Sequence, residues 1–188
     1  MPQRRRRSSI ILGLLALGLL AGAALTVPPP AQAVDAVGPY YAKPAWDRKM
    51  GVANRFVVLT NWASQAVLDK ETGLVWERSP ASAIFNWDGA RGHCKDLTTG
   101  TRRGWRLPSI HELQSLIDPS VALPGPTLPL GHPFLTVQSA FYWSATTDAV
   151  DPARAWGVLF DIGGVSSNNK TVSNPAWCVR GGLHAEQY

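Results

Sequence analysis

The 188-residue sequence contains little cysteine, and it lacks several motifs that mark catalytic or metal-binding proteins. Its two cysteines, Cys94 and Cys178, do not form a C-x-x-C pair. No H-E-x-x-H motif and no G-x-S-x-G elbow occur, and no two of the four histidines are spaced i, i+4. These absences argue against a redox or metal-binding cysteine pair, a histidine metal site and a serine hydrolase.

The sequence has no apolar run long enough for a membrane-spanning helix. Its clearest apolar run covers residues 10–25, which is 16 residues, whereas a spanning helix needs about 20. Four arginines at 4–7 precede this run, and A-Q-A at 31–33 follows it. This order is typical of a secretory signal peptide, so we expect residues 1–33 to be removed and the protein to be periplasmic, cell-surface or secreted. An uncleaved segment would be its only expected membrane contact.

A basic surface of the kind that nucleic acid requires is also missing from the sequence. The whole chain has 18 bases and 13 acids, a net charge of +5. Residues 34–188 retain 14 bases and 13 acids, a net charge of +1, and no basic run among them is longer than two residues, as at Arg102-Arg103. Because nucleic-acid binding leaves a basic stripe or patch, we expect no nucleic-acid partner.

The sequence after the predicted signal peptide is long enough for one domain. It holds all eight tryptophans, which supply core material, and the chain's 17 glycines and 15 prolines favour turns and loops over long helices. In an exported protein, an even pair of cysteines predicts one disulfide, here Cys94–Cys178. A metal-binding or redox pair is the less favoured alternative.

Apolar patterns predict strands, then two helices, a long loop and further strands. The expected strands are 55–60, 66–69, 73–78, 141–146, 154–160 and 176–180. One helix should begin at Asn86, a good N-cap residue, and bury Trp87, Ala90, Cys94 and Leu97. A second should begin at Ser109, which forms a capping-box pattern with Glu112, and end at Pro119. This order predicts an α+β fold.

Six sequence tags occur in an order that resembles a known family. The tags are T-G-L-V-W at 72–76, Trp87 with Cys94, G-W-R-L-P-S at 104–109 followed by E-L-Q-S-L-I-D at 112–118, Y-W-S-A-T at 142–146, A-W-G-V-L-F at 155–160, and C-V-R-G at 178–181. Together they resemble the DUF1566 domain, also called the Lcl C-terminal domain, over about residues 68–182. We therefore divide the chain into a signal peptide (1–33), an irregular leader (34–53) and a domain of this type (54–188).

The resemblance implies a C-type-lectin-like fold, with two helices packed on small antiparallel sheets and with long loops. In that fold a disulfide joins the first helix to the last strand. In the collagen-like adhesin that gives the family its name, the domain is associated with binding of sulfated glycans and with trimer formation. The resemblance therefore implies an exported binding domain, with a homo-oligomer as one expectation, although this sequence has no Gly-X-Y collagen region.

The residues inside the tags are expected to be structural. Arg106 should hold a backbone carbonyl or an acid such as Glu112 or Asp118, because a buried arginine is usually paired. The full set of framework residues is Trp76, Trp87, Trp105, Arg106, Pro108, Glu112, Trp143, Trp156 and Arg180. Trp46 and Trp62 lie outside the tags, so either could be a platform for sugar stacking, although packing is the favoured role.

Loops at 120–139, 147–153 and 166–175 are the expected ligand-binding region. The predicted contact residues are Asp148, Asp151, Arg154, Asn168, Asn169 and Lys170. They offer donors and acceptors suited to hydroxyl groups or anionic sugars. This pattern favours a non-catalytic binding module that recognises carbohydrate or another cell-surface ligand. The alternative is a structural protein that binds a protein partner, or itself, in the cell envelope.

Calcium is the cofactor for which we looked for a site, because sugar-binding C-type lectins use it. It takes six to eight oxygen ligands, and the candidate donors are Asp148, Asp151, Asp161, Asn168 and Asn169. The E-P-N, Q-P-D and W-N-D motifs of those lectins are absent. We therefore expect no cofactor and interpret these residues as loop polars that cap turns, with calcium as the less favoured alternative. Assigning both cysteines to the bridge leaves none for cysteine-based catalysis. We expect no enzyme activity, and an enzyme of unknown chemistry is the least favoured alternative.

Overall fold

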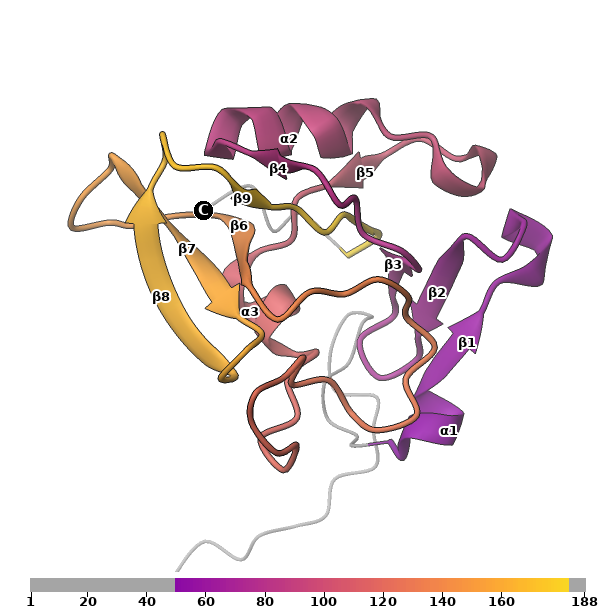
Figure 1. Cartoon of the computed structure of the whole chain (residues 1–188). Helices are drawn as coiled ribbons and strands as arrows, with labels where there is room; N and C mark the ends of the chain where they lie inside the picture. The colour runs from indigo at the N-terminus through magenta and orange to yellow at the C-terminus, as the bar shows by residue number, and fades with distance from the viewer. Residues whose placement is uncertain (1–49, 183–188) are drawn as a thin grey trace, which may run out of the picture. The chain divides into compact units, whose positions relative to one another are not determined.

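The structure is a computed structural model that describes residues 50–182 (Figure 1). The predicted signal peptide, most of the leader, Trp46 and His184 lie outside the described residues. The first described element is a short helix, α1 (Val52–Arg55). It begins inside the predicted leader, and Val52 packs against the core. Helix α1 was not predicted from the sequence.

A five-stranded antiparallel sheet forms one part of the fold. Its order is β1 (Phe56–Val58), β2 (Ala66–Asp69), β3 (Leu74–Glu77), β10 (Val179–Arg180) and β5 (Trp105–Arg106). The β2–β3 hairpin lies where it was predicted, and Gly73 has a φ of 72° there, which glycine adopts without steric cost. The last strand is shorter than predicted, and β5 was not predicted because two residues give no periodicity.

A three-stranded antiparallel sheet contains β6 (Phe141–Thr147), β7 (Arg154–Leu159) and β8 (Gly164–Asn169), in that order. The prediction that residues 166–175 form a loop is wrong at both ends, because residues 166–169 belong to β8 and residues 174–175 form a short strand. An edge strand can carry polar side chains, and β8 is such a strand. Its sequence therefore gives no strand pattern, and only its backbone pairing with β7 shows that it is a strand. A further pair joins β4 (Ile84–Phe85) to β9 (Asn174–Pro175).

Two longer helical elements follow β4. Helix α2 (Trp87–Asp96) begins after Asn86, whose Oδ1 accepts a hydrogen bond from the Gly89 amide, as the sequence predicts. Helix α3 (Ile110–Gln114) has the predicted capping box, but it ends well before Pro119. The following residues continue as turns, with Leu116 N bonded to Leu113 O and Ile117 N to Gln114 O. In Figure 1, α2 runs beside β4 and β5.

The core has two hydrophobic clusters. The first surrounds Trp76 and Trp177, both fully buried, and the second surrounds the disulfide between Cys94 of α2 and Cys178. The bridge is the predicted one, and its Cα atoms are 5.4 Å apart. Trp156 is only half-buried. The small antiparallel sheets and the few short helices make the domain a mixed α+β fold. Within residues 50–182, no helix has the length and apolar character to cross a membrane.

Candidate functional site

The six predicted ligand contacts lie together at one end of the β6–β7–β8 sheet. Asp148 and Asp151 lie in the β6–β7 connection, and Arg154 begins β7. The register pairs Arg154 with Asn169, the last residue of β8. Lys170 follows directly, and its backbone amide donates to Ala153 O. The sequence analysis named these six residues as one set on separate loops, and the structure brings them together, in part on a strand that was not predicted.

Most acceptors in this cluster are occupied by the backbone around them. The Oδ1 atoms of Asp148 and Asp151 accept amides two residues ahead, at 3.0 and 3.1 Å. Asn168 Oδ1 accepts the Asn169 amide at 2.8 Å, and Asn169 Oδ1 accepts the Thr171 amide at 3.0 Å. The hydrogen bond from the Val150 amide is the largest cause that lowers the pKa of Asp148. The first role of these side chains is therefore to stabilise the turns in which they lie.

Arg154 covers the outer edge of the sheet. Trp156 is paired with Ser167, and the Trp156 carbonyl faces β6, because Ser144 Oγ donates to it. In such an antiparallel pair the backbone groups of the partner residue point the opposite way. The Ser167 carbonyl therefore faces outward from β8. The Arg154 guanidinium donates to that carbonyl and, at 3.0 Å, to Ser167 Oγ.

The oxygen donors considered for calcium do not all gather at this end. Asp161 lies in the β7–β8 turn, at the opposite end of both strands. Each strand has six residues, or about 20 Å at 3.3 Å per residue. Asp161 therefore lies too far from Asp148 and Asn169 to share an ion with them.

Lys170 connects this cluster to helix α2. Its Nζ lies 4.0 Å from the centroid of the Trp87 ring and donates to Thr147 Oγ1 at 3.0 Å. Arg91 also contacts Trp87, with its guanidinium carbon 4.8 Å from the ring centroid. Trp87 itself is buried, and its Nε1 donates to Ser144 O at 2.8 Å. The cationic side chains of Lys170 and Arg91 therefore both contact Trp87, in the first turn of α2.

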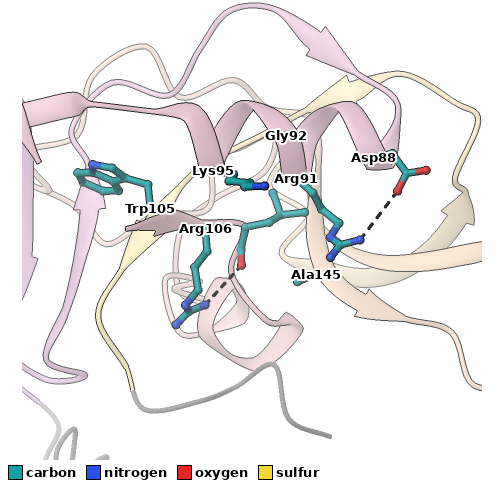
Figure 2. Close-up of a pocket in the computed structure, with 8 residues that line it drawn as sticks. Asp88, Arg91, Gly92, Lys95, Trp105, Arg106 and Ala145 are labelled. Carbon is teal, nitrogen blue, oxygen red and sulfur yellow. Dashed lines mark hydrogen bonds and ion pairs between the residues drawn. The ribbon is translucent and has the colours of Figure 1, made fainter. Parts of the chain in front are cut away.

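A pocket of about 370 Å³ lies along the same helix, between α2, β5 and β6 (Figure 2). It is lined by Asp88, Arg91, Gly92, Lys95, Trp105, Arg106, Leu107 and Ala145. The four α2 residues occur at i, i+3, i+4 and i+7, which is one stripe of a helix. It is a different stripe from the one that buries Trp87, Ala90 and Cys94. The sequence analysis missed this pocket, although the spacing of D, R, G and K was a usable signal.

The three cationic side chains of the pocket differ in their availability. Arg106 makes a two-point ion pair with Glu112, at 2.6 and 2.7 Å, and donates to Gly181 O at 2.8 Å, so the fold already uses it, as predicted. Arg91 is exposed and lies 3.9 Å from Asp88. Lys95 is exposed, and within residues 50–182 it has no ion pair. Arg91 and Lys95 are therefore the cations that can meet a ligand.

A second group of cations surrounds Trp62, which is half-buried and packs edge-on against Trp105 with ring centroids 6.3 Å apart. The guanidinium carbons of Arg102 and Arg180 each lie 5.5 Å from the Trp62 ring centroid. Arg180 also donates to the Arg103 carbonyl, in keeping with its predicted structural role. A sugar could stack on Trp62 only by displacing these side chains.

The sequence analysis also missed a buried polar cluster behind α2. Glu77, His93 and Cys178 place one carboxylate oxygen, one ring nitrogen and one sulfur within 4.8 Å of one another. The sulfur belongs to the disulfide, so it is not a free thiolate ligand. Burial raises the pKa of Glu77 to about 7, opposed by the hydrogen bond from the Cys178 amide, and burial lowers the pKa of His93. None of these residues lines the α2 pocket.

Comparison with known proteins identifies the family. The family model described as the Lcl C-terminal domain matches residues 65–180, which is more than half of the chain. No curated protein matches the sequence closely enough to be reported as a relative. The matched range runs from the start of β2 to the end of β10, so it contains the disulfide and the α2 pocket. The chain belongs to the Lcl C-terminal domain family.

Proposed function

We propose that this protein is an exported, non-catalytic binding module that recognises an anionic carbohydrate of a cell surface in the α2 pocket. The observation that carries the proposal is the exposed pair of cations, Arg91 and Lys95, on the pocket stripe of α2. The pocket volume of about 370 Å³ lies within the usual size range of small-ligand sites. A carboxylate or sulfate could accept from both side chains, and the wall formed by Leu107 and Ala145 could meet the apolar part of a sugar ring.

The predicted contacts at the sheet end take a secondary part in this proposal. Asp148, Asp151, Asn168 and Asn169 each use Oδ1 on a local backbone amide, so part of their acceptor capacity already stabilises turns. Lys170 lies beside Trp87 at the start of α2. It could extend the binding surface for a ligand longer than one sugar.

A C-type-lectin-like fold is part of the same proposal. Its support is the disulfide from α2 to the segment just before β10, the strand inserted between β3 and β5. Export is supported by the same bridge, because disulfides persist in oxidising compartments. A binding role, rather than acid–base catalysis, is supported by the position of Glu77. Its carboxyl has a pKa near 7, but it is buried against Cys178 and lies outside the pocket.

A glycan array probed with the oxidised full chain tests the proposal, with calcium and with chelator. We expect acidic glycans to bind in both conditions. Lys95→Glu should weaken binding by about tenfold to a hundredfold, because it replaces a charge-assisted contact with repulsion. Lys70→Glu is the matched control, since Lys70 is exposed on the β2–β3 hairpin and does not line the pocket. Equal losses in the two variants, or no acidic glycan bound, would refute the proposed site.

A further inference from the structure

We infer that the ligand of the α2 pocket carries hydroxyl groups next to a single carboxylate, as in an unsulfated hexuronic-acid sugar, and that Asp88 selects it against densely charged polyanions. This inference rests on the proposed function and specifies its ligand class. It depends on one feature of the pocket, which is that a carboxylate lines the same wall as its cations.

The charge of the pocket is low and mixed in sign. Arg106 is neutralised by Glu112. The remaining ionic side chains are Asp88, Arg91 and Lys95, which together give a net charge of +1. A sugar ring with one negative charge in the pocket balances this set, as each ring of a uronic-acid chain does. A ring with several sulfates would bring surplus negative charge close to Asp88, at a cost that increases as water is excluded.

Asp88 is free to accept from a ligand. Its side chain is 82% exposed, and its contact with Arg91 is long, at 3.9 Å. An exposed ion pair of this kind contributes little, so a ligand can replace it at small cost. A hydroxyl donor satisfies the Asp88 carboxylate, whereas a sulfate, which has only acceptors, leaves it facing negative charge.

The spacing on α2 suits a ligand with these groups in sequence. Asp88 and Lys95 are seven positions apart, or about 10 Å at 1.5 Å per residue. Gly92 lies between them and lines the pocket. A Cβ placed on Gly92 would have no atom within 4 Å, so the helix surface is open there. A sugar ring could lie over Gly92, with hydroxyls toward Asp88 and a carboxylate toward Lys95.

Two probes of similar length distinguish an unsulfated uronic-acid ligand from a densely sulfated one. They are a hexagalacturonate and a dextran sulfate hexamer. Calorimetric titration of the full chain should show tighter binding of hexagalacturonate. Asp88→Asn should weaken hexagalacturonate binding by about threefold to tenfold, because it removes a charged acceptor. The same variant should strengthen dextran sulfate binding. Asp96→Asn is the matched control, since Asp96 lies exposed on α2 outside the pocket, and it should change both affinities little.

The outcomes distinguish this inference from the function on which it rests. If Asp88→Asn strengthens both ligands alike, Asp88 acts only through its charge and the inference is overturned, while anion binding in the pocket stands. If the wild type prefers dextran sulfate, the ligand class is wrong. If neither probe nor any other acidic glycan binds, the proposed function fails and the inference fails with it. Opposite shifts for the two probes in Asp88→Asn, with none in Asp96→Asn, support it.

Discussion

Single residues of this domain divide according to whether the fold already uses their polar groups. Arg55 and Asp69 are both buried and make a two-point pair at 2.8 and 3.0 Å. Arg106 with Glu112 repeats this arrangement, and a buried charge whose partner is removed costs several kcal/mol, about 3–5. Lys95 and Asp88 are different, because both are exposed and neither is held by a short ion pair. Only residues of this second kind can exchange water for a ligand at small cost.

At the residue scale, Glu77 should make stability depend on pH. Its pKa is about 7 in the folded chain and 4.5 without the protein environment, so the folded state holds the proton more tightly. The stabilisation is therefore complete below about pH 4.5 and is lost as the pH rises through 7, by about 3 kcal/mol in total. Urea unfolding of the wild type and Glu77→Gln across this range measures it. The variant should retain the acceptor for the Cys178 amide and show a flatter pH profile; parallel profiles would contradict the assignment.

Gly92 allows the pocket to be closed without touching a charge. Gly92→Leu should place a side chain in open pocket space and abolish carbohydrate binding. Gly92→Ala is the control variant, and it should raise the free energy of unfolding by about 1 kcal/mol, because alanine favours a helix interior over glycine. Thermal unfolding and glycan binding of both variants test this. Undiminished binding by a folded Gly92→Leu protein would place the ligand elsewhere.

At the scale of elements, the short strands and helices depend on contacts made far along the chain. Strand β10 lies between β3 and β5 although it comes last of the three in sequence. Strand β8 has no apolar alternation, and its pairing with β7 alone makes it a strand. Helix α2 was predictable because Asn86 caps it and its buried stripe has helical spacing. Its second stripe, which forms the pocket, was not recognised because charged residues on a helix normally indicate plain solvent exposure.

Strand β8 is an edge strand, and Arg154 covers one of its outward-facing backbone carbonyls. Arg154→Ala should free the Ser167 carbonyl and allow edge-to-edge pairing between molecules, since unpaired strand edges promote association. We expect a mass that rises with concentration in light scattering, where the wild type shows a smaller rise. Arg103→Ala is the control, because Arg103 is an exposed arginine that lies outside the β6–β7–β8 sheet. Identical behaviour of the two variants would mean that Arg154 does not protect the edge.

At the scale of the whole molecule, the disulfide joins helix α2 to the end of the matched domain. Cys94 and Cys178 are 84 positions apart, and both are fully buried. The bridge holds α2, which carries the pocket cations, against the segment that leads into β10. The pocket geometry and the global stability therefore depend on the same covalent link.

Removing the bridge should strongly destabilise the domain. Cys94→Ser with Cys178→Ser should lower the free energy of unfolding by about 4–5 kcal/mol, because the bridge closes a loop of more than 80 residues. Chemical unfolding of the double variant against the oxidised wild type measures this, and intact-protein thiol labelling should find no reactive cysteine in the native wild type. Two labelled thiols would contradict the bridge and reopen the metal or redox alternative.

The sequence by itself determined the class of this protein and much of its framework. Periodicity, capping residues and turn glycines act over a few positions, so α2, the start of α3 and the β2–β3 hairpin could be read directly. The ordered tags identified the family, and the cysteine count predicted the bridge.

Only the tertiary structure decided which polar groups remain available. A balanced overall charge gave no sign that Arg91 and Lys95 share a wall with Asp88, or that Glu112 already neutralises Arg106. It also gave no sign that Oδ1 of Asp148, Asp151, Asn168 and Asn169 each accepts a nearby backbone amide. Availability depends on which partners come within hydrogen-bond distance, and those partners are brought there by strand pairing and by a disulfide that spans most of the domain. Local sequence carries no record of such long-range contacts, so the spacing on α2 could mark a helix stripe but not the wall that β5 and β6 add to it.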